Sequence, residues 1–63
     1  MANVSYEVND CIRLIGEITR ELEALGQEIP KAMQGIDTSK IVKELQQSAQ
    51  SYKNVRSVLY RID

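Results

Sequence analysis

Apolar residues recur along the first half of the chain with the spacing of a long helix. Steps of four and three residues alternate without a break through Val4, Val8, Cys11, Ile15, Ile18, Leu22, Leu25 and Ile29. This repeat places one stripe of side chains along one side of an α-helix, whereas a strand would need a period of two. The pattern predicts a helix over about residues 4–28, with Asn3 or Ser5 as its N-cap.

A similar stripe occupies the second half of the chain. Its members are Ile41, Leu45, Ser48, Tyr52, Val55, Leu59 and Ile62, and Ser48 is the one polar residue among them. Asp37, Thr38 and Ser39 stand just ahead of it, and each can accept a hydrogen bond from a free amide of a first helical turn. We therefore predict a second helix over about residues 38–62.

The segment between the stripes is suited to a chain reversal. Pro30 has no amide hydrogen and its ring would clash with the carbonyl of Gly26, so we expect the first helix to end before it. Gly35 can take a left-handed conformation at little cost. These residues predict a connection over about residues 30–37. The alternative is a single kinked helix.

Register and charge both favour an antiparallel hairpin. A reversal near Met33 would bring Leu22 level with Leu45 and Val8 level with Leu59. Residues 1–30 carry six acidic and two basic side chains, and residues 31–63 carry six basic and three acidic ones, so the halves have charges of −4 and +3. We predict an all-α fold in which residues 1–63 form one two-helix, coiled-coil-like hairpin domain.

Two helices alone leave too much apolar surface uncovered. Ile12 and Leu14 flank the first stripe, and Val42, Ala49 and Val58 flank the second. A chain of 63 residues also seldom stabilises itself with one core, and a single cysteine rules out an internal disulfide. We expect a bundle of four or more helices, completed by self-association or by another protein.

The sequence offers little material for catalysis or for holding a cofactor. It contains no histidine to activate Cys11, which we expect to be buried in the stripe, with a disulfide between two chains as the alternative. A solvated helix face is the better interpretation of the glutamates at positions 17, 21, 23 and 28. We predict no enzymatic activity, no cofactor, no metal site and no small-molecule substrate.

The candidate contact patch combines flanking apolar residues with two tyrosines near one end of the hairpin. It consists of Tyr6, Ile12, Leu14, Val42, Ala49, Arg56, Val58 and Tyr60. The second helix also has a basic side, but the net charge of −1 disfavours nucleic acid as the main ligand. The expected partner is a protein.

Targeting signals are few. No run of about 18 apolar residues occurs that could span a membrane, and the start lacks the basic and apolar regions of a classical signal peptide. The expected compartment is the cytoplasm. Export by a route that needs no signal peptide stays open.

Two families of bacterial secretion systems offer resemblances. The start Asn3-Val4-Ser5-Tyr6, leading into a heptad helix and a glycine-bearing turn, resembles small type VII secretion proteins and their toxin-associated helical partners, although the Trp-x-Gly turn is absent. Glu44-Leu45-Gln46, followed by Gln50 and Tyr52, is similar to type III needle subunits.

These resemblances imply a non-enzymatic helical interaction module, such as a secretion partner or targeting protein that binds another helical protein. The alternatives are a small phage-type or bacterial inhibitor that occludes a host protein, and a needle-type structural subunit.

Overall fold

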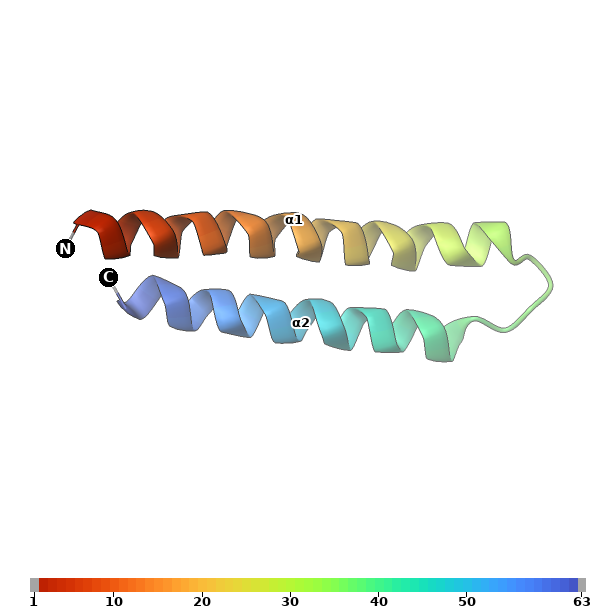
Figure 1. Cartoon of the computed structure of the whole chain (residues 1–63). Helices are drawn as coiled ribbons and strands as arrows, with labels where there is room; N and C mark the ends of the chain where they lie inside the picture. Colours follow the sequence, from red (N-terminus) through yellow and green to blue (C-terminus); the bar gives the residue numbers. More distant parts are fainter. Residues whose placement is uncertain (1, 63) are drawn as a thin grey trace.

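The protein is an antiparallel hairpin of two long helices. The computed structural model describes residues 2–62, with side-chain surroundings from Tyr6 onward, and contains α1 (Ala2–Ala32) and α2 (Ser39–Ile62). The helices lie side by side along their length, and the start of α1 is at the same end as the end of α2 (Figure 1). The Cα atoms span 53 × 15 × 8 Å, so the hairpin is long and flat. The predicted all-α hairpin is confirmed.

α1 is longer at both ends than its apolar stripe predicts. It begins at Ala2, so Asn3 and Ser5 lie within the helix and do not cap it, and it passes through Pro30 to end at Ala32. Pro30 removes one amide donor, but the amide of Met33 donates to the carbonyl of Ile29 at 3.0 Å and the helical pattern resumes. Because Pro30 lies in the last turn, the lost hydrogen bond affects only the end of the helix.

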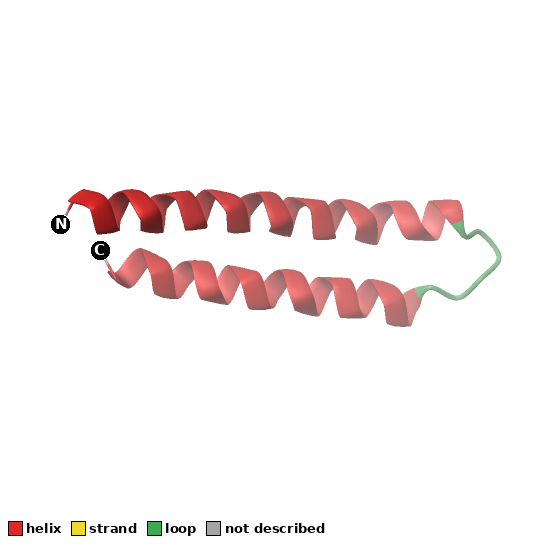
Figure 2. Cartoon of the chain, in the orientation of Figure 1, coloured by secondary structure: helices red, strands yellow, loops and turns green. Residues whose placement is uncertain are grey.

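A short loop over residues 33–38 reverses the chain (Figure 2). Gly35 adopts a φ of 86°, which is the left-handed conformation that the sequence predicts. The amide of Ile36 donates to the carbonyl of Met33 at 3.2 Å and closes the turn.

The start of α2 is stabilised by the three residues that the sequence indicates. The carbonyl of Thr38 accepts from the amide of Val42 at 2.9 Å, which makes Thr38 the N-cap. Asp37 Oδ1 accepts from the backbone amide of Ser39 at 3.0 Å and from its hydroxyl at 2.7 Å. These two hydrogen bonds stabilise the charged carboxylate and lower the pKa of Asp37.

The surface between the helices differs from the predicted one. On α1 it contains Val8, Ile12, Ile15, Thr19, Leu22, Gly26 and Ile29, and on α2 it contains Val42, Leu45, Ala49, Lys53, Arg56 and Leu59. We call these residues the helix contact. Leu22 and Leu45 line the same hollow between the helices, which confirms the predicted register at this level.

The difference is a rotation of each helix about its own axis. Thr19 and Ala49, only 4 % and 3 % exposed, take the central positions that the sequence assigned to Ile18 and Ser48. Small side chains let the two backbones approach closely, so these residues displace larger neighbours from the contact. The same rotation brings Ile12 into the contact and leaves Cys11, which was expected to be buried, exposed.

Candidate helix-docking surface

A row of apolar side chains remains exposed beside the helix contact. Its members on α1 are Cys11, Leu14, Ile18 and Leu25, and those on α2 are Ile41, Tyr52, Val55, Val58 and Ile62. We call this set the apolar face. Leu25 is 48 % exposed, Val55 49 % and Ile62 59 %, which is unusual for apolar residues at heptad positions.

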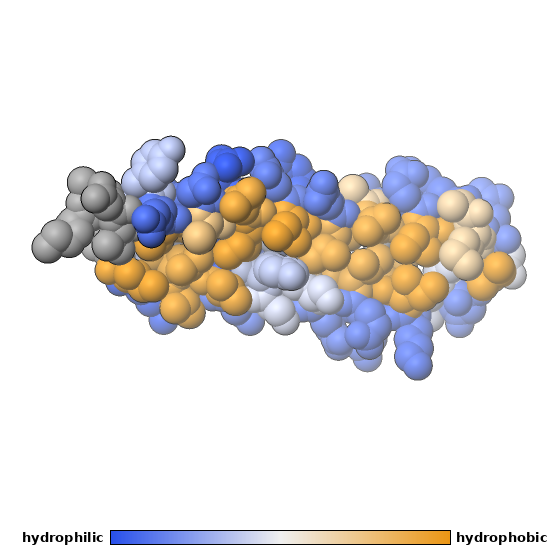
Figure 3. All heavy atoms as spheres, in the orientation of Figure 1, coloured by the Kyte–Doolittle hydropathy of each residue, from blue (hydrophilic) through white to orange (hydrophobic). Residues whose placement is uncertain are grey.

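The exposed residues of α1 and α2 share one face because of the antiparallel arrangement. On both helices, a residue of the apolar face directly precedes a residue of the helix contact: Ile18 precedes Thr19, Leu25 precedes Gly26, Ile41 precedes Val42 and Val55 precedes Arg56. Two antiparallel helices that meet along equivalent stripes turn equivalent flanks toward the same side. Figure 3 shows the result, an apolar band that follows the long axis over both helices.

The predicted contact patch is divided by the structure. Leu14 and Val58 belong to the apolar face, and Tyr6 and Tyr60 are strongly exposed. The other four members, Ile12, Val42, Ala49 and Arg56, lie in the helix contact and are buried or half-buried.

Ile18, Leu25, Ile41, Val55 and Ile62 were expected between the helices and lie instead on the open surface. The sequence signal for this arrangement was a small residue directly after a stripe position on each helix, Thr19 on α1 and Ala49 on α2.

Near the loop, the apolar face is bordered by charged residues of α2. Lys40, Ile41, Glu44, Leu45 and Ser48 surround a dip in which the apolar surface of Ile41 and Leu45 is accessible. Lys40 and Glu44 therefore stand at the edge of the apolar face, where a long charged side chain can reach past the apolar surface toward a neighbour.

Ion pairs are distributed over the remaining surface of the hairpin. Arg13 pairs with Asp10 at 2.8 Å and with Glu17 at 3.1 Å along α1. The hydrogen bond and charge of Asp10 are the main cause of a raised pKa for Arg13. Lys53 of α2 reaches Glu23 of α1 at 2.9 Å and joins the two helices. Exposed pairs of this kind orient surfaces more than they stabilise the fold.

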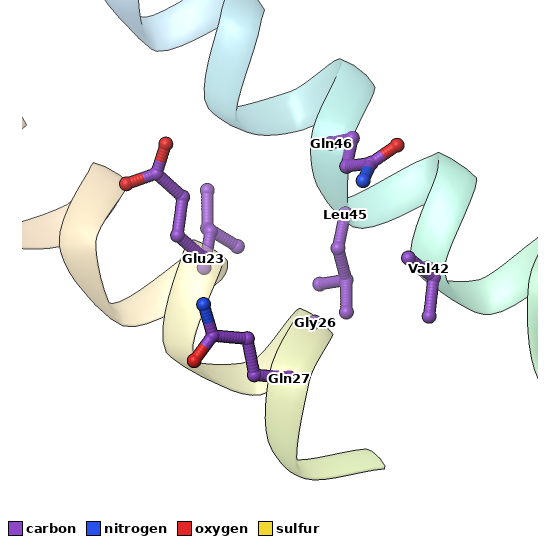
Figure 4. Close-up of a pocket in the computed structure, with 7 residues that line it drawn as sticks. Glu23, Gly26, Gln27, Val42, Leu45 and Gln46 are labelled. Atoms are coloured by element: carbon purple, nitrogen blue, oxygen red, sulfur yellow. The ribbon is translucent and has the colours of Figure 1, made fainter. Parts of the chain in front are cut away.

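The hollow that Leu22 and Leu45 line lies between the helices near the loop end. Glu23, Gly26 and Gln27 of α1 face Val42, Leu45 and Gln46 of α2, with Leu45 extending toward the backbone of Gly26 (Figure 4). A Cβ atom at position 26 would meet no other atom within 4 Å. The hollow is therefore explained by the missing side chain of Gly26.

Within residues 2–62, neither helix has a stretch apolar enough to cross a bilayer. The same part of the chain contains no cluster of three or more cysteine and carboxylate side chains that could hold a metal ion. Comparison with protein-family models, curated proteins and solved structures finds no match to this chain.

Proposed function

We propose that the protein is a non-enzymatic helical interaction module that buries its apolar face against helices of another chain. The observation that carries this proposal is the unbroken apolar band along one side of the hairpin (Figure 3). An apolar patch that extends along a whole molecule is typical of a protein interaction surface.

The geometry supports helices as the binding partner. The apolar face is long, straight and formed at heptad spacing, which matches the surface of another helix or pair of helices. A four-helix bundle buries this kind of face from two hairpins in one core. Burial stabilises the assembly by about 25 cal/mol for each Å² of apolar surface removed from water.

The proposal is tested by following helix content with protein concentration. We expect circular dichroism to show loss of helix on dilution, because the hairpin lacks a closed core of its own. A chain that stays unfolded alone at every concentration also supports an interaction module, since it then needs a different partner. A fully helical monomer whose melting temperature is independent of concentration contradicts the proposal.

Two neighbouring positions on α1 provide a matched pair of variants. Leu25 belongs to the apolar face, whereas Ala24 is exposed on the outer side of the same helix. Leu25→Glu should abolish concentration-dependent folding, because it places a charge in the buried interface. Ala24→Glu adds the same charge in water and should leave the folding curve nearly unchanged. If the two substitutions have equal effects on folding, the apolar face is not the buried surface.

A further inference from the structure

We infer that the apolar face is covered by a second copy of this chain, with the two hairpins face to face and their loops at the same end. This inference rests on the proposed function and specifies its partner. In this arrangement α1 of each copy lies over α2 of the other, and the four helices form one antiparallel bundle.

The size of the face fits a self-sufficient dimer. The hairpin is 53 Å long and 15 Å wide between Cα atoms, which corresponds to a face of roughly 800 Å². Specific protein interfaces bury about 800 Å² on each partner. Face-to-face pairing of two copies therefore reaches the size of a stable interface without any further protein.

The helix charges favour one orientation of the second copy. α1 contains six acidic and three basic residues, a net charge of −3, and α2 contains five basic residues and one acidic residue, a net charge of +4. With the loops at the same end, each acidic α1 faces a basic α2. With the loops at opposite ends, α1 faces α1 and α2 faces α2, so like charges meet.

Charged residues near both ends of the hairpin agree with this orientation. A twofold axis along the hairpin keeps every residue at its own level, so contacts between copies inherit the register in which Leu22 meets Leu45. Glu28 then lies level with Lys40 of the second copy, and Glu7 lies level with Arg61. All four are exposed, and within the described chain none of them forms an ion pair.

The opposite orientation reverses these relations. It brings Glu7 toward Glu28 of the second copy and Lys40 toward Arg61, which places like charges together at both ends of the bundle. When the loops are at the same end, Glu21 of one copy approaches Glu44 of the other near the middle of the bundle. The repulsion between these two carboxylates disfavours that orientation. This orientation therefore has two attractive positions at the ends and one repulsive position near the middle.

The orientation is tested by measuring a distance between the two loops. Gln34, exposed in the loop, is replaced by cysteine in a Cys11→Ala background and carries a nitroxide spin label. Sedimentation equilibrium should give twice the chain mass of 7.2 kDa. Electron–electron resonance should then give a label separation of about 20–30 Å, set by helix spacings of 8–10 Å and the label arms.

The remaining outcomes of the mass and distance measurements would overturn the inference in different ways. A dimer with a separation near the hairpin length of 53 Å overturns the orientation. A mass above that of a dimer overturns the two-copy assembly. An unfolded chain at every concentration overturns self-association while the proposed function stands, and a stable folded monomer overturns both.

Charge swaps test the same inference without labels. Lys40→Glu with Arg61→Glu, and separately Glu7→Lys with Glu28→Lys, should each weaken dimerisation by on the order of tenfold, and all four together should restore it. In the opposite orientation each double variant leaves like charges facing like charges. Unchanged dimerisation in both double variants, or no restoration in the fourfold variant, therefore overturns the inference.

Discussion

Thr19 has the most unusual environment of any single residue in the helix contact. Its side chain is 4 % exposed, and the hydroxyl oxygen Oγ1 has no hydrogen-bond partner. A buried hydroxyl without a partner costs stability because it has lost its hydrogen bonds to water. Its small size nevertheless allows the helices to approach beside Ala49.

Thr19→Val tests this interpretation of the helix contact. Valine keeps the shape and removes the unsatisfied oxygen, so we expect the free energy of unfolding to rise by about 1 kcal/mol. Urea denaturation at a fixed protein concentration measures the change. Ser57→Val, at an exposed position of α2 away from the apolar face, is the control and should have little effect. A marked loss of stability in Thr19→Val would show that the hydroxyl has a partner in solution.

Gly26 and Gly35 should respond in opposite ways to alanine. Gly26 is helical and a Cβ there meets open space, so Gly26→Ala should stabilise the protein by about 1 kcal/mol. Gly35 has a φ of 86°, so Gly35→Ala should destabilise it by about 1 kcal/mol. Thermal denaturation of the two variants at one concentration compares them directly. Stabilisation by both substitutions contradicts the loop conformation.

Cys11 and Ile18 show what the residue pattern could not predict. Their spacing correctly indicated a helix with an apolar side, but the stripe and its flanks are wider than one neighbouring helix can cover. Which half of that width faces the other helix depends on how closely the backbones approach. Thr19 and Ala49, the two buried residues of the helix contact, are small, and a hydrophobicity pattern gives small residues little weight.

At the scale of the helices, the turn was more predictable than the helix boundaries. Gly35 takes the expected conformation, and Asp37, Thr38 and Ser39 form the expected start of α2. The first helix passes through Pro30, which lies in its last turn, so the effect of the proline is confined to the end of the helix. Sequence rules for helix interiors therefore placed the boundary too early.

The hydrogen bonds of Asp37 predict a dependence of stability on pH. The pKa of Asp37 is lowered in the folded state, so its contribution is complete above the ordinary value of 3.8 and is lost as the pH falls through the lowered value. Asp37→Ala should therefore reduce the melting temperature at neutral pH, and this difference should disappear at strongly acidic pH. If the difference in melting temperature between the two proteins stays constant with pH, the charged carboxylate of Asp37 does not stabilise the start of α2.

At the scale of the whole molecule, the hairpin has the form of half of a helical bundle. Its two helices bury Thr19 and Ala49 against each other and leave apolar residues such as Leu25 and Val55 on a single open face. The sequence predicted both the hairpin and the excess of apolar surface. The resemblances to type VII secretion proteins and type III needle subunits stay predictions, because the fold alone carries no information about a biological process.

The reactivity of Cys11 is the most direct test of whether the apolar face is covered in solution. Its thiol is exposed in the single hairpin and belongs to that face. We expect this thiol to react slowly with a maleimide at high protein concentration and faster on dilution. The control is a cysteine at the exposed position 57 in a Cys11→Ala background, which should react quickly while the protein is helical. A Cys11 that reacts as fast as this outer thiol in a helical protein would contradict burial of the apolar face.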